Sequence, residues 1–267
     1  MKKYFLAALV SIPMTSGLLT GYASAQKWAD LTMTVVLDGA VPERKAIEMK
    51  ADPKCNNKNP LADDLIIDPK TKAIANIVFT IDTKKTKLEN SQLHPDLQKI
   101  PEGKPVLDNV MCKFEPHVMA LRVGQKIEVK NSDEAGHNAK FGFFTNKEVN
   151  PMIAAGKSVF VETTDEEKAA TKVECSIHPW MNAYVFVLNH PYIGISGVDG
   201  KIKIEKLPAG VELDFKIWHE SQNKSIEEVS LGGTKATWTK GTVKMTLKEG
   251  ANDLGTLLLK PDRFKAK

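Results

Sequence analysis

The chain has 267 residues and a formal net charge of +4, from 37 basic and 33 acidic side chains. Removing residues 1–25, which carry two lysines and no acidic residue, lowers this charge to +2. So small a charge gives no reason to expect binding to nucleic acid or to an anionic membrane surface. The remaining length of about 240 residues suits one large domain or two ordinary ones.

The N-terminus has the pattern of a secretory signal peptide. Two lysines precede an apolar stretch, and residues 23–25 (Ala-Ser-Ala) match a cleavage site. We therefore expect a signal peptide over residues 1–25, a mature protein that begins at Gln26, and a periplasmic or secreted location. The alternative is an uncleaved anchor, but the stretch is shorter than the roughly 20 apolar residues that a membrane span needs.

The rest of the chain predicts an all-β fold. Aromatic and β-branched residues occur in short runs separated by Gly, Pro, Asn and Asp, which is typical of β-sandwiches and barrels. We expect strands over 31–37, 77–81, 118–121, 126–130, 141–144, 158–161, 173–175, 183–188, 201–204, 211–217 and 243–247. The lysine-rich stretch 83–105 predicts a solvated loop or a partly ordered insertion.

Changes in this texture predict three segments in the mature chain. We expect an N-terminal β segment and loop over 26–105, a β-domain over 106–190, and a smaller β-domain over 191–267. The N-terminal strands belong to the middle domain in one arrangement. In the other they pair with the C-terminal strands, and the middle domain is then an insertion.

The three cysteines are Cys55, Cys112 and Cys175. In an oxidising compartment an odd count leaves one thiol over. A bridge between Cys55 and Cys112 would stabilise the fold by roughly 4 kcal/mol on the chain-entropy estimate and would leave Cys175 free. The connectivity cannot be deduced from sequence alone.

Cys175, the cysteine that this pairing would leave free, begins the segment with the strongest chemical signal. This segment is CSIHPWM, from Cys175 to Met181. It places a thiolate, the imidazole of His178 and a thioether within one loop, and His137 offers a second imidazole upstream. Sulfur together with imidazole selects copper over hard cations, and two His, one Cys and a weak axial Met are the ligands of electron-transfer copper.

These residues resemble the cupredoxin family. The family pattern here reads GQKIEVKNSD, then Gly136-His137-Asn138, then CSIHPWM, and the spacing of the last loop is most similar to that of the amicyanins. The later segments DGKIKIEKLPAG and KIWHE resemble transthyretin-like, carboxypeptidase-regulatory-type β-sandwiches. The early phrases VVLDGAVP and IVFTID resemble the opening strands of that sandwich and favour the insertion arrangement. Chains of this two-part kind are similar to exported proteins labelled methylamine utilisation proteins.

The resemblance implies a cupredoxin Greek-key β-sandwich with a second, smaller transthyretin-like β-sandwich. It also implies one type 1 copper ion, with His137, Cys175, His178 and Met181 as ligands. Asn138 would tie the His137 loop to the cysteine-bearing loop. The implied partner is a redox protein such as a cytochrome c or a dehydrogenase.

We expect Pro179 and Trp180 on the surface beside a half-exposed His178 ring; the alternative for Trp180 is a core position. His94 and His117 are expected to be structural or surface residues. His190 and His219 are a weaker possibility for a second metal site at the domain junction.

The expected function is one-electron transfer rather than catalysis, because a methionine in the axial position leaves no open coordination position. The alternative is a binding or structural module in which the cupredoxin-like fold holds a ligand or a partner protein and the metal is structural.

Overall fold

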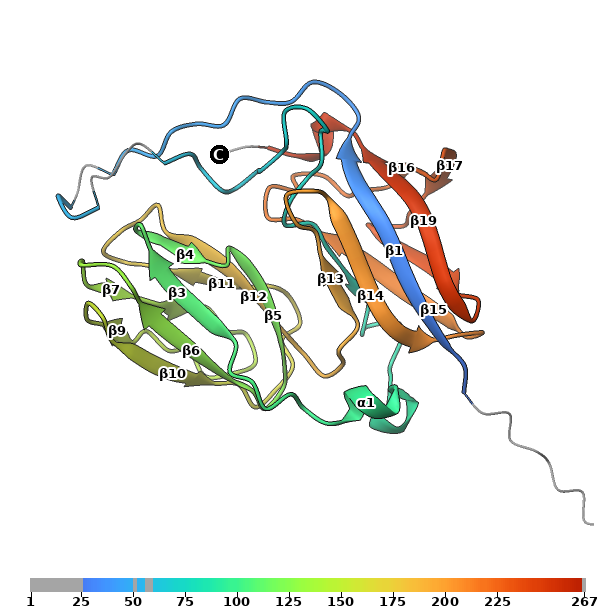
Figure 1. Ribbon diagram of the computed structural model, residues 1–267, viewed down its shortest axis with the longest axis horizontal. Coiled ribbons are helices and arrows are strands. Elements are labelled where there is room, and N and C mark those ends of the chain that lie inside the picture. The colour runs from blue at the N-terminus through green and yellow to red at the C-terminus, as the bar shows by residue number, and fades with distance from the viewer. Residues whose placement is uncertain (1–25, 50–51, 56–59, 266–267) are drawn as a thin grey trace, which may run out of the picture.

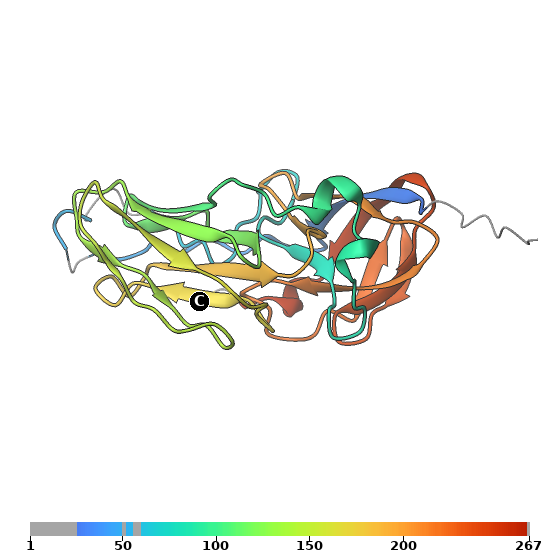
Figure 2. The same ribbon diagram turned by 90° about the horizontal axis from the view of Figure 1, so that it is seen from below.

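The computed structural model describes residues 26–49, 52–55 and 60–265, so the predicted signal peptide lies outside the described residues. The chain is nearly all β, as predicted, and its sheets form two units that lie end to end (Figures 1 and 2). In the described part of the chain, no helix has the length and apolar character needed to cross a bilayer.

One unit combines strands from both ends of the chain. Its two sheets have the strand orders β14-β1-β19-β16-β17 and β13-β2-β15-β18. The strands are β1 (Trp28–Leu37), β2 (Val78–Ile81), β13 (Ile193–Ile195), β14 (Lys201–Pro208), β15 (Glu212–Trp218), β16 (Glu228–Leu231), β17 (Thr234–Thr237), β18 (Thr242–Thr246) and β19 (Gly250–Leu259). β1 pairs antiparallel with β14 and parallel with β19. The strand pairing therefore follows the insertion arrangement, while the domain limits given above stay a prediction.

The other unit has sheets in the orders β10-β6-β3-β4 and β5-β12-β11-β8, with a short pair β7-β9 at one end. Its strands are β3 (Val106–Val110), β4 (Lys113–Glu115), β5 (Val118–Arg122), β6 (Lys126–Asn131), β7 (His137–Asn138), β8 (Lys140–Phe141), β9 (Met152–Ile153), β10 (Ser158–Glu162), β11 (Thr171–Glu174) and β12 (Asn182–Leu188). The connection from β2 to β3 contains η1 (Asn90–Gln92) and α1 (Pro95–Gln98), so it is partly ordered, and η2 (Pro261–Arg263) follows β19.

Alternating side chains explain how each unit forms its core. Along β1 every second residue is buried, from Ala29 to Leu37, which places one face of the strand in the core and the other toward water. Gly200 is needed at the turn before β14, because its φ is +72° and a Cβ there would lie 2.5 Å from the carbonyl oxygen of Val35.

The two units contact each other through a small apolar cluster. Val78 of β2 packs with Val118, Phe186 and Leu188 of the other unit. The ring of Trp218 lies edge-on to the ring of Phe186, with centroids 5.2 Å apart. The junction is therefore held by aromatic and aliphatic contacts in addition to the connecting chain.

Between β1 and β2 the chain forms an arm, whose described residues are 44–49, 52–55 and 60–63. Two of its segments run alongside each other, because the Ile47 N–H donates to the Pro60 carbonyl at 2.7 Å and the Ala62 N–H donates to the Lys45 carbonyl at 2.8 Å. Figure 1 shows these segments, in blue and teal, running from the β1 unit along the other unit. The arm thus carries chain from one unit to the far end of the other.

The strands predicted from the sequence agree with those observed to within a few residues, with one exception. The prediction of a strand over 141–144 is wrong, because β8 ends at Phe141. The backbone N–H groups of Phe144, Thr145 and Asn146 instead donate to the carboxylate of Glu167 at 2.8–3.2 Å. Because these N–H groups donate to a side chain, they do not form the backbone hydrogen bonds that would extend the strand.

Candidate metal centre

The predicted ligands come from two loops at the end of the inserted unit. His137 lies in β7, directly after the turn that follows β6. Cys175 follows β11, and His178 and Met181 lie in the bend that leads into β12. β11 and β12 are antiparallel neighbours, paired up to Glu174 and Asn182, so this bend is short and fixed at both ends.

Three of the four predicted ligands come together. The Nδ1 atoms of His137 and His178 lie 2.9 Å apart, and the Cys175 Sγ lies 3.6 Å from the His178 Nδ1. All three ligand atoms lie within 4.8 Å of one another, and the side chains are buried. Two ligand atoms bound to one metal at about 2.0–2.3 Å lie roughly 3–4 Å apart. The spacing and the chemistry of these donors therefore fit a shared metal ion.

Met181 lies in the same bend and is only 1% exposed. Its backbone closes the bend, because its N–H donates to the His178 carbonyl at 2.9 Å and its carbonyl accepts from the Cys175 N–H at 3.2 Å. The side chain belongs to the same hydrophobic core as Cys175. The structure thus places Met181 beside the other predicted ligands, and the role of its sulfur stays a prediction.

Asn138 connects the two loops. Its Oδ1 accepts a hydrogen bond from the Ser176 N–H at 2.9 Å and lies 3.4 Å from the Cys175 Sγ. Its Nδ2 donates to the Asn150 Oδ1 at 2.5 Å and to the Ser176 Oγ at 3.2 Å. Because Asn138 is 2% exposed, these hydrogen bonds are shielded from water and fix the cysteine relative to β7.

Each histidine also has a carboxylate on its outer nitrogen. The His137 Nε2 lies 3.0 Å from the Asp133 Oδ2, and the His178 Nε2 lies 3.2 Å from the Asp52 Oδ2. Hydrogen bonds from the Lys54 N–H and from His178 hold the pKa of Asp52 below its ordinary value. A carboxylate in this position keeps a proton on Nε2, so Nδ1 is the nitrogen available to a metal.

The electrostatics of the site favour a thiolate. Burial lowers the pKa of His137, but hydrogen bonds to Asp133 and Cys175 outweigh it and raise this pKa to about 9. Burial raises the pKa of Cys175, but hydrogen bonds from His137 and from neighbouring backbone N–H groups bring it down to about 6. Cys175 is therefore deprotonated at neutral pH, which is the form of cysteine that binds metals.

The arm covers the site from outside. Cys55 of the arm forms a disulfide with Cys112, which confirms the predicted pairing and leaves Cys175 free. The Cys55 Sγ lies 3.5 Å from the His178 Nε2, and Lys54 reaches the carbonyl of Glu134 at 3.2 Å. This contact between the disulfide and a predicted ligand joins residues far apart in the chain.

The expectation of a half-exposed His178 ring is wrong, because the ring is fully buried. The cause is the arm, which places Asp52 and Cys55 against the edge of the ring that was expected to face water. Pro179 is exposed, as expected, whereas Trp180 is half-buried and packs against the core of the unit. Sequence reasoning missed Asp52 and Asp133; Asp133, four residues before His137, lay close enough in sequence to be considered.

The remaining histidines lie elsewhere. His117, at the junction of the units, is 8% exposed and contacts the carboxylate of Glu220. The Nδ1 atoms of His190 and His219 accept hydrogen bonds from the backbone N–H groups of Tyr192 and Ser221. In the described residues, groups of three closely spaced metal-binding side chains gather only around His137 and His178. A second site built from His190 and His219 therefore finds no support.

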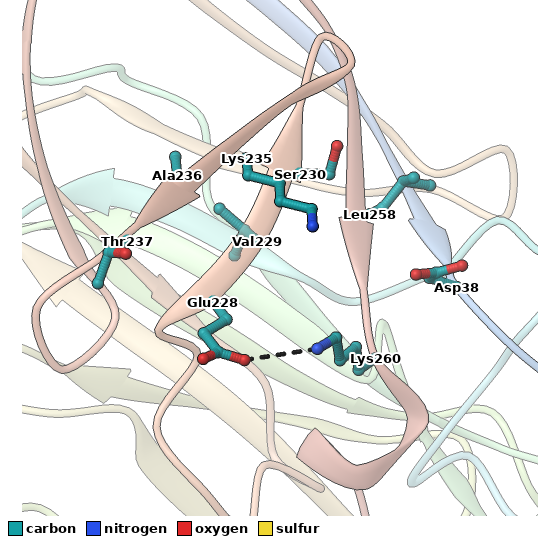
Figure 3. Close-up of a pocket in the computed structure, with 9 residues that line it drawn as sticks. All are labelled: Asp38, Glu228, Val229, Ser230, Lys235, Ala236, Thr237, Leu258 and Lys260. Atoms are coloured by element: carbon teal, nitrogen blue, oxygen red, sulfur yellow. Dashed lines mark hydrogen bonds and ion pairs between the residues drawn. The ribbon is translucent and has the colours of Figure 1, made fainter.

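The protein also has several hollows. One of about 380 Å³ is formed by β16, β17 and the ends of β1 and β19, and an ion pair between Glu228 and Lys260 crosses it (Figure 3). Another, of about 230 Å³, lies beside the predicted ligand loop and is lined by Trp180 and Met181 together with His117. Only the second of these hollows touches the candidate metal centre.

No protein-family model matches the chain, and no curated protein matches it. Among solved structures, a purple cupredoxin from Nitrosopumilus maritimus aligns over 32% of this chain and 100% of its own length, with 21% identity and a TM-score of 0.27. A mutant of amicyanin in its oxidised state aligns over 34% of this chain and 87% of its own, with 22% identity and a TM-score of 0.30. A copper-containing nitrite reductase from Thermus scotoductus SA-01 aligns over 36% of this chain and 25% of its own, with 19% identity and a TM-score of 0.30.

Proposed function

We propose that this protein is an exported type 1 copper protein that transfers single electrons. The observation that carries the proposal is the convergence of the His137 Nδ1, the His178 Nδ1 and the Cys175 Sγ at one buried point. Soft sulfur together with two imidazoles is the donor set that selects copper in electron-transfer sites. A copper ion held there supplies reversible one-electron chemistry.

The chain's own residues would hold this site rigid. Met181 would be the axial ligand, since its side chain is buried in the same bend and is the sulfur that completes the donor set. Asp133 and Asp52 orient the two imidazoles, and Asn138 fixes the cysteine loop. A donor set that cannot rearrange keeps the same geometry in both oxidation states, which favours electron transfer over catalysis.

The location and the partner follow from the same proposal. The N-terminal pattern supports a cleaved signal peptide over 1–25 and therefore a periplasmic or secreted protein. The disulfide is consistent with an oxidising compartment. The partner would be a redox protein such as a cytochrome c or a dehydrogenase. We further propose that residues 106–190 form the cupredoxin domain and that the strands around it form a transthyretin-like sandwich, as in the exported methylamine utilisation proteins.

The test is an optical and EPR spectrum of the copper-loaded protein. We expect one bound copper, intense visible absorption from thiolate-to-copper charge transfer, and loss of that absorption in Cys175→Ser. A protein that binds copper and stays colourless under oxidant is not a type 1 copper protein. A binding module with a structural metal would instead keep its function in Cys175→Ser, so the same variant separates the two functions.

A further inference from the structure

We propose that electrons enter and leave this site through Trp180 and not through the edge of a ligand imidazole. The inference rests on the proposed one-electron function and adds the route by which the centre communicates with an external reagent.

The outer edges of both imidazoles are closed. The His178 Nε2 faces the Asp52 Oδ2 at 3.2 Å and the Cys55 Sγ at 3.5 Å, and its ring is fully buried. The two disulfide-bonded cysteines are themselves only 1% and 2% exposed, so the disulfide also lies between the His178 ring and solvent. An electron acceptor therefore cannot touch the His178 ring from this side.

The second imidazole offers no exit either. The His137 Nε2 lies against the Asp133 Oδ2 at 3.0 Å, and its ring is also fully buried. Asp133 is in turn held by the Cys112 N–H, which donates to the same oxygen at 2.8 Å. The disulfide thus closes the site on the side of both histidines.

Trp180 connects the covered ligand to solvent. Its ring centroid lies 5.2 Å from that of His178, at an interplanar angle of 51°. Its Nε1–H donates to the Cys112 carbonyl at 3.1 Å, which fixes the ring against the disulfide-bearing turn. The ring is half-buried and lines the hollow of about 230 Å³ beside Met181. A π system in contact with the predicted ligand His178 therefore reaches a hollow outside the covered site.

The competing route runs through the chain next to the thiolate. Ser176 and Ile177 are both exposed, Ile177 by 44%, and they follow Cys175 directly. This route passes through saturated side chains and backbone, whereas the route through Trp180 passes from one aromatic ring to the next. Ile177 is therefore the matched control for Trp180.

The proposed step moves one electron and changes no bond. In the oxidising direction, a copper ion held by these residues would give up one electron, passing from the cuprous to the cupric state, and the electron would reduce a one-electron outer-sphere acceptor such as a substitution-inert metal complex. No proton moves, because both Nε2 atoms stay paired with their carboxylates.

The experiment compares Trp180→Phe, Trp180→Leu and Ile177→Ala in the full copper-loaded protein. Spectra and reduction potentials are recorded first, so a colourless protein reports failure of the proposed function and not of the route. Oxidation and reduction are then followed by stopped flow with one anionic and one cationic complex, because the hollow contains the charged Asp63–Lys113 pair.

We expect the rate constants of Trp180→Leu to fall by about tenfold or more with both reagents, equal to about 1.4 kcal/mol of activation free energy, at unchanged spectrum and potential. Trp180→Phe, which keeps an aromatic ring but loses the hydrogen bond to Cys112, and Ile177→Ala should keep rates close to wild type. Wild-type rates in Trp180→Leu, or a greater loss in Ile177→Ala, would overturn the proposal.

A second measurement needs no electron transfer. In the metal-free protein, modification by diethyl pyrocarbonate is mapped by mass spectrometry against the unfolded chain. We expect His178 to be protected, and modification at the rate of the unfolded chain would overturn the claim that its edge is closed.

Discussion

The carboxylate of Asp133 joins the backbone of Cys112 to the imidazole of His137. A single oxygen accepts the Cys112 N–H at 2.8 Å and lies 3.0 Å from the His137 Nε2. One carboxylate oxygen therefore links the disulfide-bonded Cys112 to the predicted ligand His137.

Asp133→Asn should weaken copper binding. The neutral amide oxygen is a weaker acceptor than the charged carboxylate for the Cys112 N–H and the His137 Nε2, so the His137 ring is less firmly oriented. Loss of such a contact typically costs about 10–100-fold in metal affinity. The affinity is measured by competition with a chelator, and the exposed neighbour Glu134→Gln serves as the control. Equal affinities in the two variants would show that Asp133 does not orient the ligand.

Cys55→Ser combined with Cys112→Ser should destabilise the protein. The disulfide closes a loop with a sequence separation of 57 residues, and on the chain-entropy model its removal lowers the free energy of unfolding by roughly 4 kcal/mol. Denaturant unfolding of the metal-free protein measures this, with the wild type in a thiol-free phosphine reductant as a second preparation lacking the bond. A midpoint unchanged from the oxidised wild type would contradict the expectation.

Met181→Ala and Met119→Ala separate a ligand role from a packing role. Both side chains lie in the same core and are only 1% and 6% exposed. Each truncation should therefore lower the free energy of unfolding by about 2–5 kcal/mol. Only Met181→Ala should also shift the reduction potential and the visible spectrum of the copper-loaded protein. Matching spectra and potentials in the two variants would remove Met181 from the ligand set.

The buried rings of His190 and His219 should make the protein less stable in mild acid. Burial lowers the pKa of each to about 4, despite the nearby Glu220 in the case of His219. Above about pH 6.5 the rings are neutral in both states and their contribution is complete. As the pH falls toward 4, the unfolded chain binds protons that the folded protein does not, and the free energy of unfolding decreases by on the order of 3 kcal/mol per ring.

The measurement is the free energy of unfolding between pH 7 and pH 4, compared with His219→Asn. Asparagine can still accept the Ser221 N–H that the His219 Nδ1 accepts at 3.2 Å, and it does not titrate. The pH slope should be smaller in the variant. A slope identical to that of the wild type would show that His219 does not resist protonation.

Local sequence was enough to predict about half of the strands and the loop that brings the predicted ligands together. Cys175, His178 and Met181 lie within one bend, so their proximity follows from their spacing, and Asn138 follows His137 directly. The disulfide could be predicted as one of the possible pairings. These features depend on residues that are close together in the sequence, or on the number of cysteines in the chain.

The cover over His178 could not be predicted in this way. Asp52 and Cys55 are separated from His178 by more than a hundred residues, and the arm that carries them has little regular secondary structure and no alternating pattern. The strand β19, in the sequence GANDLGTLLL, was also missed, because Gly, Asn and Asp in its first half hide its alternation. Its place beside β1 is decided by tertiary pairing across the whole chain.

The arm leaves the β1 strand of one unit, covers the end of the other unit that holds the predicted ligands, and returns to β2. The accessibility of the imidazole is thus a property of the whole polypeptide and does not belong to the inserted sandwich alone. In a fragment cut to the inserted strands, water would reach the outer edge of the His178 ring, so electrochemistry on such a fragment would not describe the full chain.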